Sequence, residues 1–293
     1  MRIRFAVLLA LLLAASSAAC SRKGPAVIVG SQSGVEQQLV SEVIAQHLEK
    51  KLGKDAVTRN FALGASEVVH QQTLAGQVDL YPEYSGIALT SILKLSPTSD
   101  PAATREQVRE FYKFRFQFEW LGPLGFDNRY QMVIRKSVSE SERIVSLSGA
   151  SERAKGWSLG LSADFQASST GSTLLMKTYQ IGMASPVRTA SQVELYNGLL
   201  RGQFDLISGR VTDPQLQSPE FVGLNDDRQA FVPFECGIAV RSDTLQKFPG
   251  LAASLNELAG KFTNETMRTM NAEAGKGRSH AELAAAFLRS VGL

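Results

Sequence analysis

The sequence predicts an α/β protein with two lobes of the same wiring that face each other across a crevice. The first observation is a strand–helix–strand–helix–strand order over residues 27–80, which indicates a largely parallel sheet. The second is the return of that order over residues 158–207. The third is a short motif that occurs twice in nearly the same form, as A-G-Q-V-D-L at 75–80 and R-G-Q-F-D-L at 201–206. Each occurrence has the pattern of a helix end, a glycine turn and a strand.

The first lobe opens on a short β-branched strand, Val27–Gly30, that leads into a helix. Apolar residues recur at helical spacing over Val35–Leu52, and Gly53 stands where a glycine often ends a helix. The remaining elements expected in this lobe are a strand at 57–63, a helix that ends near residue 74 and a strand at 78–80.

An aromatic segment follows this third strand. Tyr81 and Tyr84 flank Pro82 and Glu83, and we expect a turn just past the strand end that presents the rings to a ligand crevice. A tyrosine-bearing surface turn is the alternative interpretation of these residues alone. For Glu83, a carboxylate near the proposed site, capping of the helix that follows Gly86 is the alternative role.

The second lobe repeats the order of the first, and further strands connect the two. Its expected elements are strands at 158–161 and 204–207 and helices at 172–179 and 192–200. Strands at 130–134 and 237–240 are the natural crossovers between the lobes. We expect the last helices to return to the first lobe, at 245–258, 264–274 and 281–291.

The N-terminal residues have the pattern of an export signal. Two early arginines precede an apolar run at 5–15 that is too short to span a bilayer, and small residues lead to Cys20. Cys20 fits the lipid-accepting cysteine of a bacterial lipoprotein, so we expect a signal peptide at 1–19 and a lipidated tether at 20–25. Ordinary cleavage just before Cys20 is the alternative, because a serine stands where that signal usually has a leucine-like residue.

Several classes of function are disfavoured by composition. The formal net charge of +3 includes the two arginines of the signal, and no basic block occurs, which argues against nucleic acid as a partner. The three histidines are scattered without ligand spacing, so no metal site is expected. Cys236 lies in an apolar run and is interpreted as a buried small hydrophobe. Without a nucleophile elbow or a phosphate-loop lysine, we expect neither an enzyme nor a cofactor.

Short motifs follow one another along the chain. They are G-S-Q-S-G-V-E-Q (30–37), D-L-Y-P-E-Y-S-G (79–86), W-L-G-P-L-G-F-D-N-R-Y (120–130), L-Y-N-G-L-L-R-G-Q-F-D-L (195–206), F-V-P-F-E-C-G-I-A-V-R (231–241) and A-A-A-F-L-R-S-V-G-L (284–293). Each is weak singly, but their order and spacing over nearly all of the mature chain resemble the substrate-binding proteins of ABC-type glycine betaine, choline and osmoprotectant uptake systems, the OpuAC-like family.

The resemblance implies a two-lobed periplasmic binding protein fold of type II. In that fold two mixed sheets are flanked by helices and joined by two crossover strands. We accordingly divide the sequence into lobe one, at 26–133 plus 236–293, and lobe two, at 134–235.

In that family a quaternary ammonium sits in a box of aromatic rings, where cation–π attraction is worth roughly 0.5 to 2 kcal/mol per good face. The resemblance places Tyr84, Tyr130 and Phe234 at three walls of the box. The remaining wall, usually aromatic, falls on Arg210. A guanidinium in a dry box repels a trimethylammonium group unless a carboxylate neutralises it.

The groups that grip the solute carboxylate also differ from the family pattern. Members that bind betaine use a lysine, a threonine and an arginine at places that the resemblance assigns here to Gln32, Ile87 and Ser168. The scaffold is therefore kept while the chemistry of the site is changed. Further cleft candidates, for which a loop or capping role is the alternative, are Gln37, Asn128 and Thr212.

From these residues we expect a small betaine-type or amphoteric carboxylate solute. Its carboxylate meets the planar fork of Arg210 and its other end lies against the rings, so choline, which has no anion, is the poorest fit. In the alternative orientation Arg210 points out of the crevice, pairs with Asp213 or Glu235, and leaves a partial cage for a betaine.

The resemblance implies a solute-binding lipoprotein of an ABC uptake system, located in the periplasm or otherwise outside the cytoplasm. It would close its lobes on the solute and deliver it, as a monomer tethered by its lipid, to a permease and ATPase complex in the inner membrane. The alternative is a ligand-sensing extracytoplasmic binding protein for an anionic solute without a quaternary amine, which signals to a membrane partner.

Overall fold

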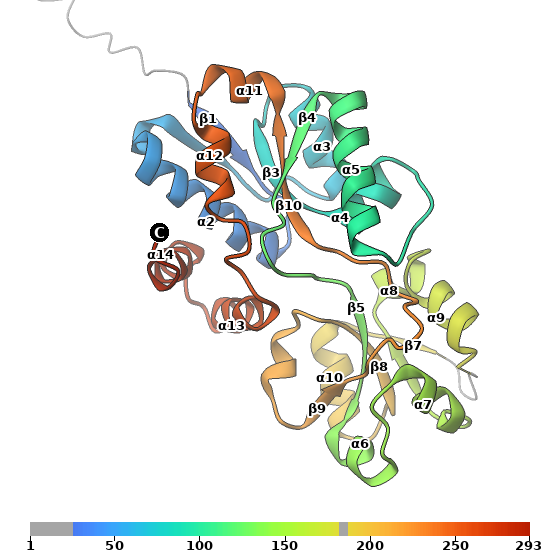
Figure 1. Ribbon diagram of the computed structural model, residues 1–293. Coiled ribbons are helices and arrows are strands. Elements are labelled where there is room, and N and C mark those ends of the chain that lie inside the picture. The colour runs from blue at the N-terminus through green and yellow to red at the C-terminus, as the bar shows by residue number, and fades with distance from the viewer. Residues whose placement is uncertain (1–25, 182–186) are drawn as a thin grey trace, which may run out of the picture.

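The computed structural model describes residues 26–181 and 187–293, and these fold into two α/β lobes (Figure 1). The signal peptide expected at 1–19 and the lipidation expected at Cys20 lie outside these residues. Within the described ranges, none of the helices combines the length and the apolar character needed to cross a bilayer.

The first lobe is built on a mixed five-stranded sheet with the order β2-β1-β3-β10-β4. β1 pairs in parallel with β2 and β3, whereas β10 is antiparallel to both of its neighbours. Its strands are β1 (Val27–Gly30), β2 (Val57–Asn60), β3 (Leu80–Tyr84), β4 (Phe118–Leu121) and β10 (Cys236–Arg241).

The second sheet repeats this arrangement, with the order β7-β6-β8-β5-β9 and β5 as the antiparallel fourth strand. Its strands are β5 (Tyr130–Arg135), β6 (Leu159–Leu161), β7 (Arg188–Thr189), β8 (Leu206–Arg210) and β9 (Phe221–Gly223). The fourth strand of each sheet follows a stretch of chain that comes from the other lobe, as expected for the crossovers (Figure 1). The lobe division drawn at 133/134 falls inside β5, all of which pairs within the second sheet.

Helices cover both faces of the first sheet. On one face, α2 packs with α12 and α14, and on the other α3 and α5 cover a cluster around Tyr81 and Tyr112. The helices of this lobe are α2 (Val35–Leu52), α3 (Ser66–Leu74), α4 (Ser85–Ile87), α5 (Pro101–Phe116), α11 (Ser242–Lys247), α12 (Leu251–Asn256), α13 (Asn264–Gly275) and α14 (His280–Ser290). Short 3-10 and π turns are η2 (Lys54–Ala56) and η3 (Ala88–Ile92).

The second lobe carries shorter helices. They are α6 (Lys136–Glu142), α7 (Leu147–Arg153), α8 (Ala163–Ala167), α9 (Ser172–Tyr179), α10 (Gln192–Leu200) and the 3-10 turn η4 (Pro214–Gln217). The C-terminal helices were expected to return to lobe one, and α12 and α14 do pack on α2. α13 contacts α2 as well, but it also contacts η4, so it connects the two lobes.

The near-copied motifs hold the same place in both sheets. Asp79 stands just before β3 and its Oδ2 accepts a hydrogen bond from the backbone N–H of Ile28 at 2.8 Å. Asp205 stands just before β8 and accepts from the backbone N–H of Ser158 at 2.9 Å. Each carboxylate therefore ties its own strand to the parallel strand beside it, which explains why both copies keep an aspartate.

The aromatic segment after Asp79 is not the turn that the sequence predicted. β3 runs over Leu80–Tyr84, so Tyr81 and Tyr84 lie inside a buried strand. Because side chains alternate along a strand, the two rings point to opposite faces of the sheet, and Tyr81 packs in the cluster around Tyr112. Proline is tolerated at Pro82 because β1 pairs with β3 only at Leu80, which leaves that side of the strand free beyond this point.

The single helix expected at 245–258 is divided into two helices in the structure. α11 ends before Phe248, whose φ of −122° and ψ of 82° are not helical, and α12 begins after Gly250 at φ 89°. Pro249 accounts for the break, because a proline disfavours the helical conformation of the residue before it.

Candidate functional site

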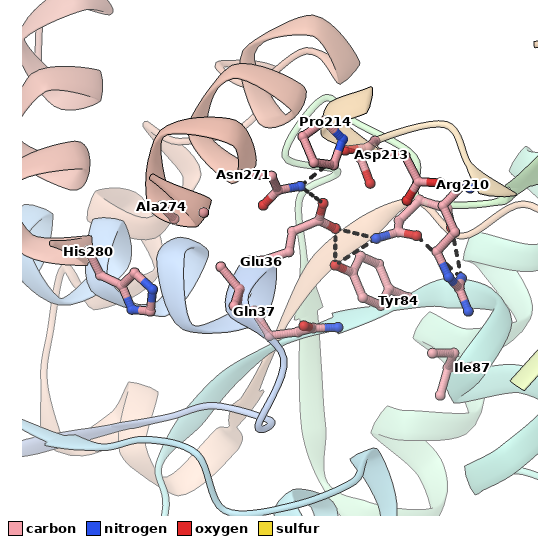
Figure 2. A pocket seen from close by; sticks show the side chains of 14 residues that line it. Glu36, Gln37, Tyr84, Ile87, Arg210, Asp213, Pro214, Asn271, Ala274 and His280 are labelled. Carbon is pink, nitrogen blue, oxygen red and sulfur yellow. Dashed lines mark hydrogen bonds between the residues drawn. The ribbon is translucent and has the colours of Figure 1, made fainter. Parts of the chain in front are cut away.

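Two hollows lie between the lobes and share a wall. The larger has a volume of about 470 Å³ and the smaller about 260 Å³. Ile87 from lobe one and Arg210 from lobe two line both. Of the residues predicted from the sequence, Tyr84, Gln37, Asn128 and Thr212 line the larger hollow (Figure 2), and Tyr130, Phe234, Gln32 and Ser168 line the smaller.

The predicted aromatic box is therefore divided between the hollows. Tyr84 is 2% exposed and lines the larger hollow, on the other side of Arg210 from Tyr130 and Phe234. Tyr130 packs edge-on against Phe165 with ring centroids 4.8 Å apart, which fixes its ring in lobe two. The rings consequently do not surround one common volume, because a guanidinium stands between them.

Arg210 ends β8 and lays its guanidinium on the rings of the smaller hollow. Its Cζ lies 4.2 Å from the centroid of the Tyr130 ring and 5.6 Å from that of Phe234. These distances are those of cation–π contacts. The protein's own cation thus occupies the ring face on which the resemblance led us to expect a quaternary ammonium.

Hydrogen bonds hold Arg210 in this position. Nη1 donates to the backbone oxygen of Asn128 at 3.0 Å, and Nη2 donates to Oδ2 of Asp164 at 2.8 Å. The alternative in which the side chain leaves the crevice for Asp213 or Glu235 is wrong. Between Arg210 and the Asp213 carboxylate, both in the described part of the chain, the only hydrogen bond comes from the backbone N–H of Arg210, at 2.8 Å, and not from its guanidinium, and Glu235 pairs with another arginine.

Glu36 is the polar centre of the larger hollow (Figure 2). It lies in the first turn of α2, is 7% exposed, and accepts hydrogen bonds from the hydroxyl of Tyr84 and from Nδ2 of Asn128. Nδ2 of Asn271, on α13, donates to its other oxygen at 2.7 Å and to the backbone oxygen of Thr212 at 3.2 Å. Glu36 therefore joins lobe one to the crossover segment and, through Asn271, to lobe two.

A second carboxylate lines this hollow from lobe two. Oδ2 of Asp213 accepts from Nε2 of Gln192 at 2.7 Å and from the hydroxyl of Tyr196 at 3.0 Å, besides the backbone of Arg210. Burial raises the pKa of Asp213 to about 6, and the Glu36 carboxylate acts in the same direction. Asp213 therefore loses its negative charge at a higher pH than an ordinary aspartate does.

A third buried carboxylate stands behind the smaller hollow. Glu83 is 0% exposed and accepts from Nε2 of Gln32 at 3.0 Å, from the Tyr84 N–H at 2.7 Å and from the hydroxyl of Ser66. It lies inside β3 and does not cap the following helix. Burial raises the pKa of Glu83 to about 7, although these hydrogen bonds lower it. Gln32 is thus oriented by a carboxyl group that titrates near neutral pH.

Glu83 should make the stability of the protein depend on pH. Its pKa rises from 4.5 in a model peptide to about 7 in the folded chain, so between these values folding takes up a proton. The stabilisation is complete below about pH 4.5 and is lost as the pH rises through 7, by on the order of 3 kcal/mol. We expect Glu83→Gln to flatten this fall in denaturant unfolding measured at pH 5 and pH 8. An unchanged difference between the two pH values in the variant would contradict the assignment.

Cys236 offers no reactive thiol. It is 2% exposed, and burial raises the pKa of its thiol well above the usual value. Among residues 26–181 and 187–293, no group of three or more His, Cys, Asp or Glu residues is placed to hold a metal ion.

Sequence reasoning missed three residues of the site: Glu36, Asn271 and Asp164. The signal for Glu36 was present in the G-V-E-Q motif, where a carboxylate begins a helix at the crevice. The signal for Asp164 was its place one turn after β6, in the lobe that carries Arg210. No local pattern marks Asn271, whose role arises only where α13 meets both lobes.

Comparison with known proteins places these features in context. The family model described as the substrate binding domain of ABC-type glycine betaine transport systems matches residues 25–290. A solved structure of a glycine betaine/carnitine/choline ABC transporter superposes with a TM-score of 0.83 at 26% identity, covering 90% of this chain and 98% of that one. The two-lobed fold expected from the sequence is thereby confirmed.

Two relatives are similar in sequence. The carnitine transport binding protein of Listeria monocytogenes is 26% identical over 304 residues, which cover 99% of this chain and 97% of that protein. The ergothioneine transport permease/ergothioneine binding protein of Helicobacter pylori (strain G27) is 26% identical over 272 residues, which cover 91% of this chain and 48% of that protein. The chain therefore spans about half the length of the second relative. Both are named as transport proteins.

Proposed function

This chain belongs to the family of substrate-binding domains of ABC-type glycine betaine transport systems, and on that premise we propose that its cleft captures a betaine-type or other amphoteric carboxylate solute whose carboxylate binds Arg210. Its role as the solute-binding component of an ABC transport system follows from the family. Binding proteins of such importers work outside the cytoplasm.

The position of the Arg210 guanidinium carries this proposal. It lies at the wall common to both hollows, so a solute in either one can reach it. Its partner Asp164 has a side chain 57% exposed, and a solute carboxylate can replace or join such a partner without breaking a buried contact. The planar fork then binds the carboxylate through two donors while its face stays on Tyr130.

The names of the relatives support the same chemical class. Carnitine, ergothioneine and glycine betaine each combine a carboxylate with a trimethylammonium group in one small molecule. In this chain the carboxylate half of such a molecule has a defined partner. The cationic half is directed toward the larger hollow, because Arg210 already covers the Tyr130 ring.

The partners and the cellular location are part of the proposal. A solute that touches Arg210 on lobe two and Tyr84 on lobe one stabilises a closed form, and we expect a permease with its ATPase in the inner membrane to recognise that form. We also propose a monomer that is tethered by a lipid on Cys20, which precedes the described residues.

Calorimetry and small-angle scattering test this function. We expect glycine betaine or carnitine to bind and to compact the protein, and choline to bind most weakly. Tyr130→Ala should lower the affinity for the bound zwitterion roughly tenfold, because the ring that positions Arg210 is lost. Tyr130→Phe is the matched control that keeps the ring and loses only the hydroxyl. Tight binding of choline with Arg210 intact, or saturation without compaction, would contradict the proposal.

A further inference from the structure

The larger hollow holds more negative charge than the described residues neutralise. Glu36 and Asp213 both line it, and within residues 26–181 and 187–293 neither forms an ion pair. The donors to Glu36 are a phenol and two amides, all neutral. Arg210 lines the same hollow, but its Nη2 is bonded to Asp164. Two carboxylates in a partly buried space, whose one arginine is already paired with a third carboxylate, favour the entry of a further cation.

Acceptor atoms in this hollow also lack donors. The hydrogen bonds to Asp213 all reach Oδ2, and no described residue donates to Oδ1. Oδ1 of Asn271 is buried and has no partner among the described residues. Flipping the Asn271 side-chain amide would not give this oxygen a donor without cost, because Nδ2 would then no longer donate to Glu36. A buried acceptor without a donor is rare and unfavourable, so Oδ1 of Asn271 points to a bound group that donates hydrogen bonds, and Oδ1 of Asp213, which is not buried, is open to accept from the same group.

We propose that the larger hollow receives the cationic end of the solute, and that this cation carries N–H donors, as a protonated amine or a guanidinium does. The inference rests on the proposed function and narrows the solute class within it. The solute is an amino or guanidino carboxylic acid whose cation meets Glu36, Asp213 and Asn271 while its carboxylate meets Arg210 (Figure 2).

A fully methylated ammonium satisfies this site poorly. It has no N–H, so it leaves Oδ1 of Asn271 unpaired. It also gains no cation–π contact with Tyr130, because the guanidinium of Arg210 covers that ring face. The hollow itself is large enough for a cation with its connecting carbons, at about 470 Å³. Because Arg210 borders it, a short aliphatic spacer joins the two charged ends of such a solute.

A matched pair of solutes tests the inference. 4-Aminobutanoate and 4-(trimethylammonio)butanoate have the same carboxylate and spacer and differ only in methylation of the nitrogen. By calorimetry on the full chain, we expect the amine to bind wild type roughly tenfold more tightly, because only it can satisfy the open acceptors.

Two variants locate the effect. Asp213→Asn keeps an oxygen for the three existing hydrogen bonds and turns the open acceptor into an amide donor, so we expect amine affinity to fall by about tenfold or more and to fall less for the trimethyl compound. Glu36→Gln should act in the same direction. Asp227→Asn is the control, because this exposed acid lines neither hollow.

The outcomes separate the inference from the function on which it rests. Equal or tighter binding of the trimethyl compound by wild type overturns the inference, as does unchanged amine affinity in both cleft variants. The proposed function survives either result if the bound solute still requires Arg210. If neither compound, nor glycine betaine, nor carnitine binds, both the inference and the proposed function fail.

Discussion

Arg210→Tyr is expected to raise the affinity of the protein for choline roughly 100-fold, because it removes a cation–cation repulsion of a few kcal/mol and adds a further aromatic face. The guanidinium now lies 4.2 Å from the Tyr130 ring centroid, so its removal opens that face to the ligand. Asp164 also loses its partner and becomes available to the choline cation. Calorimetric titration of wild type and variant with choline measures the change.

The same substitution should weaken binding of the zwitterionic solute about tenfold or more, since it loses a charge-assisted hydrogen bond to its carboxylate. Misfolding would lower the affinity for both solutes, so it cannot explain a variant that binds choline more tightly and the zwitterion more weakly. Arg210→Leu is the matched control, because it removes the charge without adding a ring and should improve choline binding less. If Arg210→Tyr weakens choline and the zwitterion alike, Arg210 does not decide which solute is accepted.

The fold was predictable where one periodic pattern ran without interruption. α2 has both of its expected ends, Val35 and Leu52, because its apolar face is continuous and Gly53 takes a φ of 97° that favours glycine. Where a proline interrupts the pattern, the sequence-based prediction was wrong in two opposite ways. Pro82 suggested a turn inside what is a buried strand, and Pro249 divides what was expected as one helix. The effect of a proline depends on which neighbouring strand needs its N–H, and that is tertiary information.

The internal repeat relates two residues of the site to each other. Asp79 and Asp205 immediately precede equivalent strands, and Tyr84 and Arg210, each five positions later, end those strands. The two residues are therefore counterparts in the two lobes, and they line the same hollow from opposite sides. The resemblance to the family assigned both residues to a box of rings, but only the structure shows that Arg210 divides the box.

The contacts of Glu36 lay beyond any local pattern. Its partner Asn271 is 235 positions away in the sequence and reaches it only because α13 contacts both α2 and η4. Which polar residues of a cleft are neutralised depends on such long-range partners. Composition and spacing can therefore name the rings of a binding site more readily than they can name its unpaired charges.

Gly125→Ala is expected to destabilise the protein by roughly 3 to 5 kcal/mol, through a strained backbone and an overlap that cannot relax. Gly125 has a φ of 116°, and a Cβ built there lies 2.3 Å from the backbone oxygen of Phe262. The segments on either side are tied together, since the N–H groups of Gly260 and Phe262 donate to the backbone oxygens of Pro123 and Leu124, each at 3.0 Å. Denaturant unfolding of the variant measures the loss.

Gly156→Ala provides the matched control for this effect. Gly156 also has a positive φ, of 96°, but a Cβ added there meets no atom within 4 Å. It therefore bears the backbone strain without the overlap, and we expect it to lose only about 1 to 2 kcal/mol. The difference between the two variants reports the close approach of the crossover segment to the chain between α12 and α13. Equal losses would mean that this approach does not limit stability, and that the segment leading into the cleft can move away from the C-terminal helices.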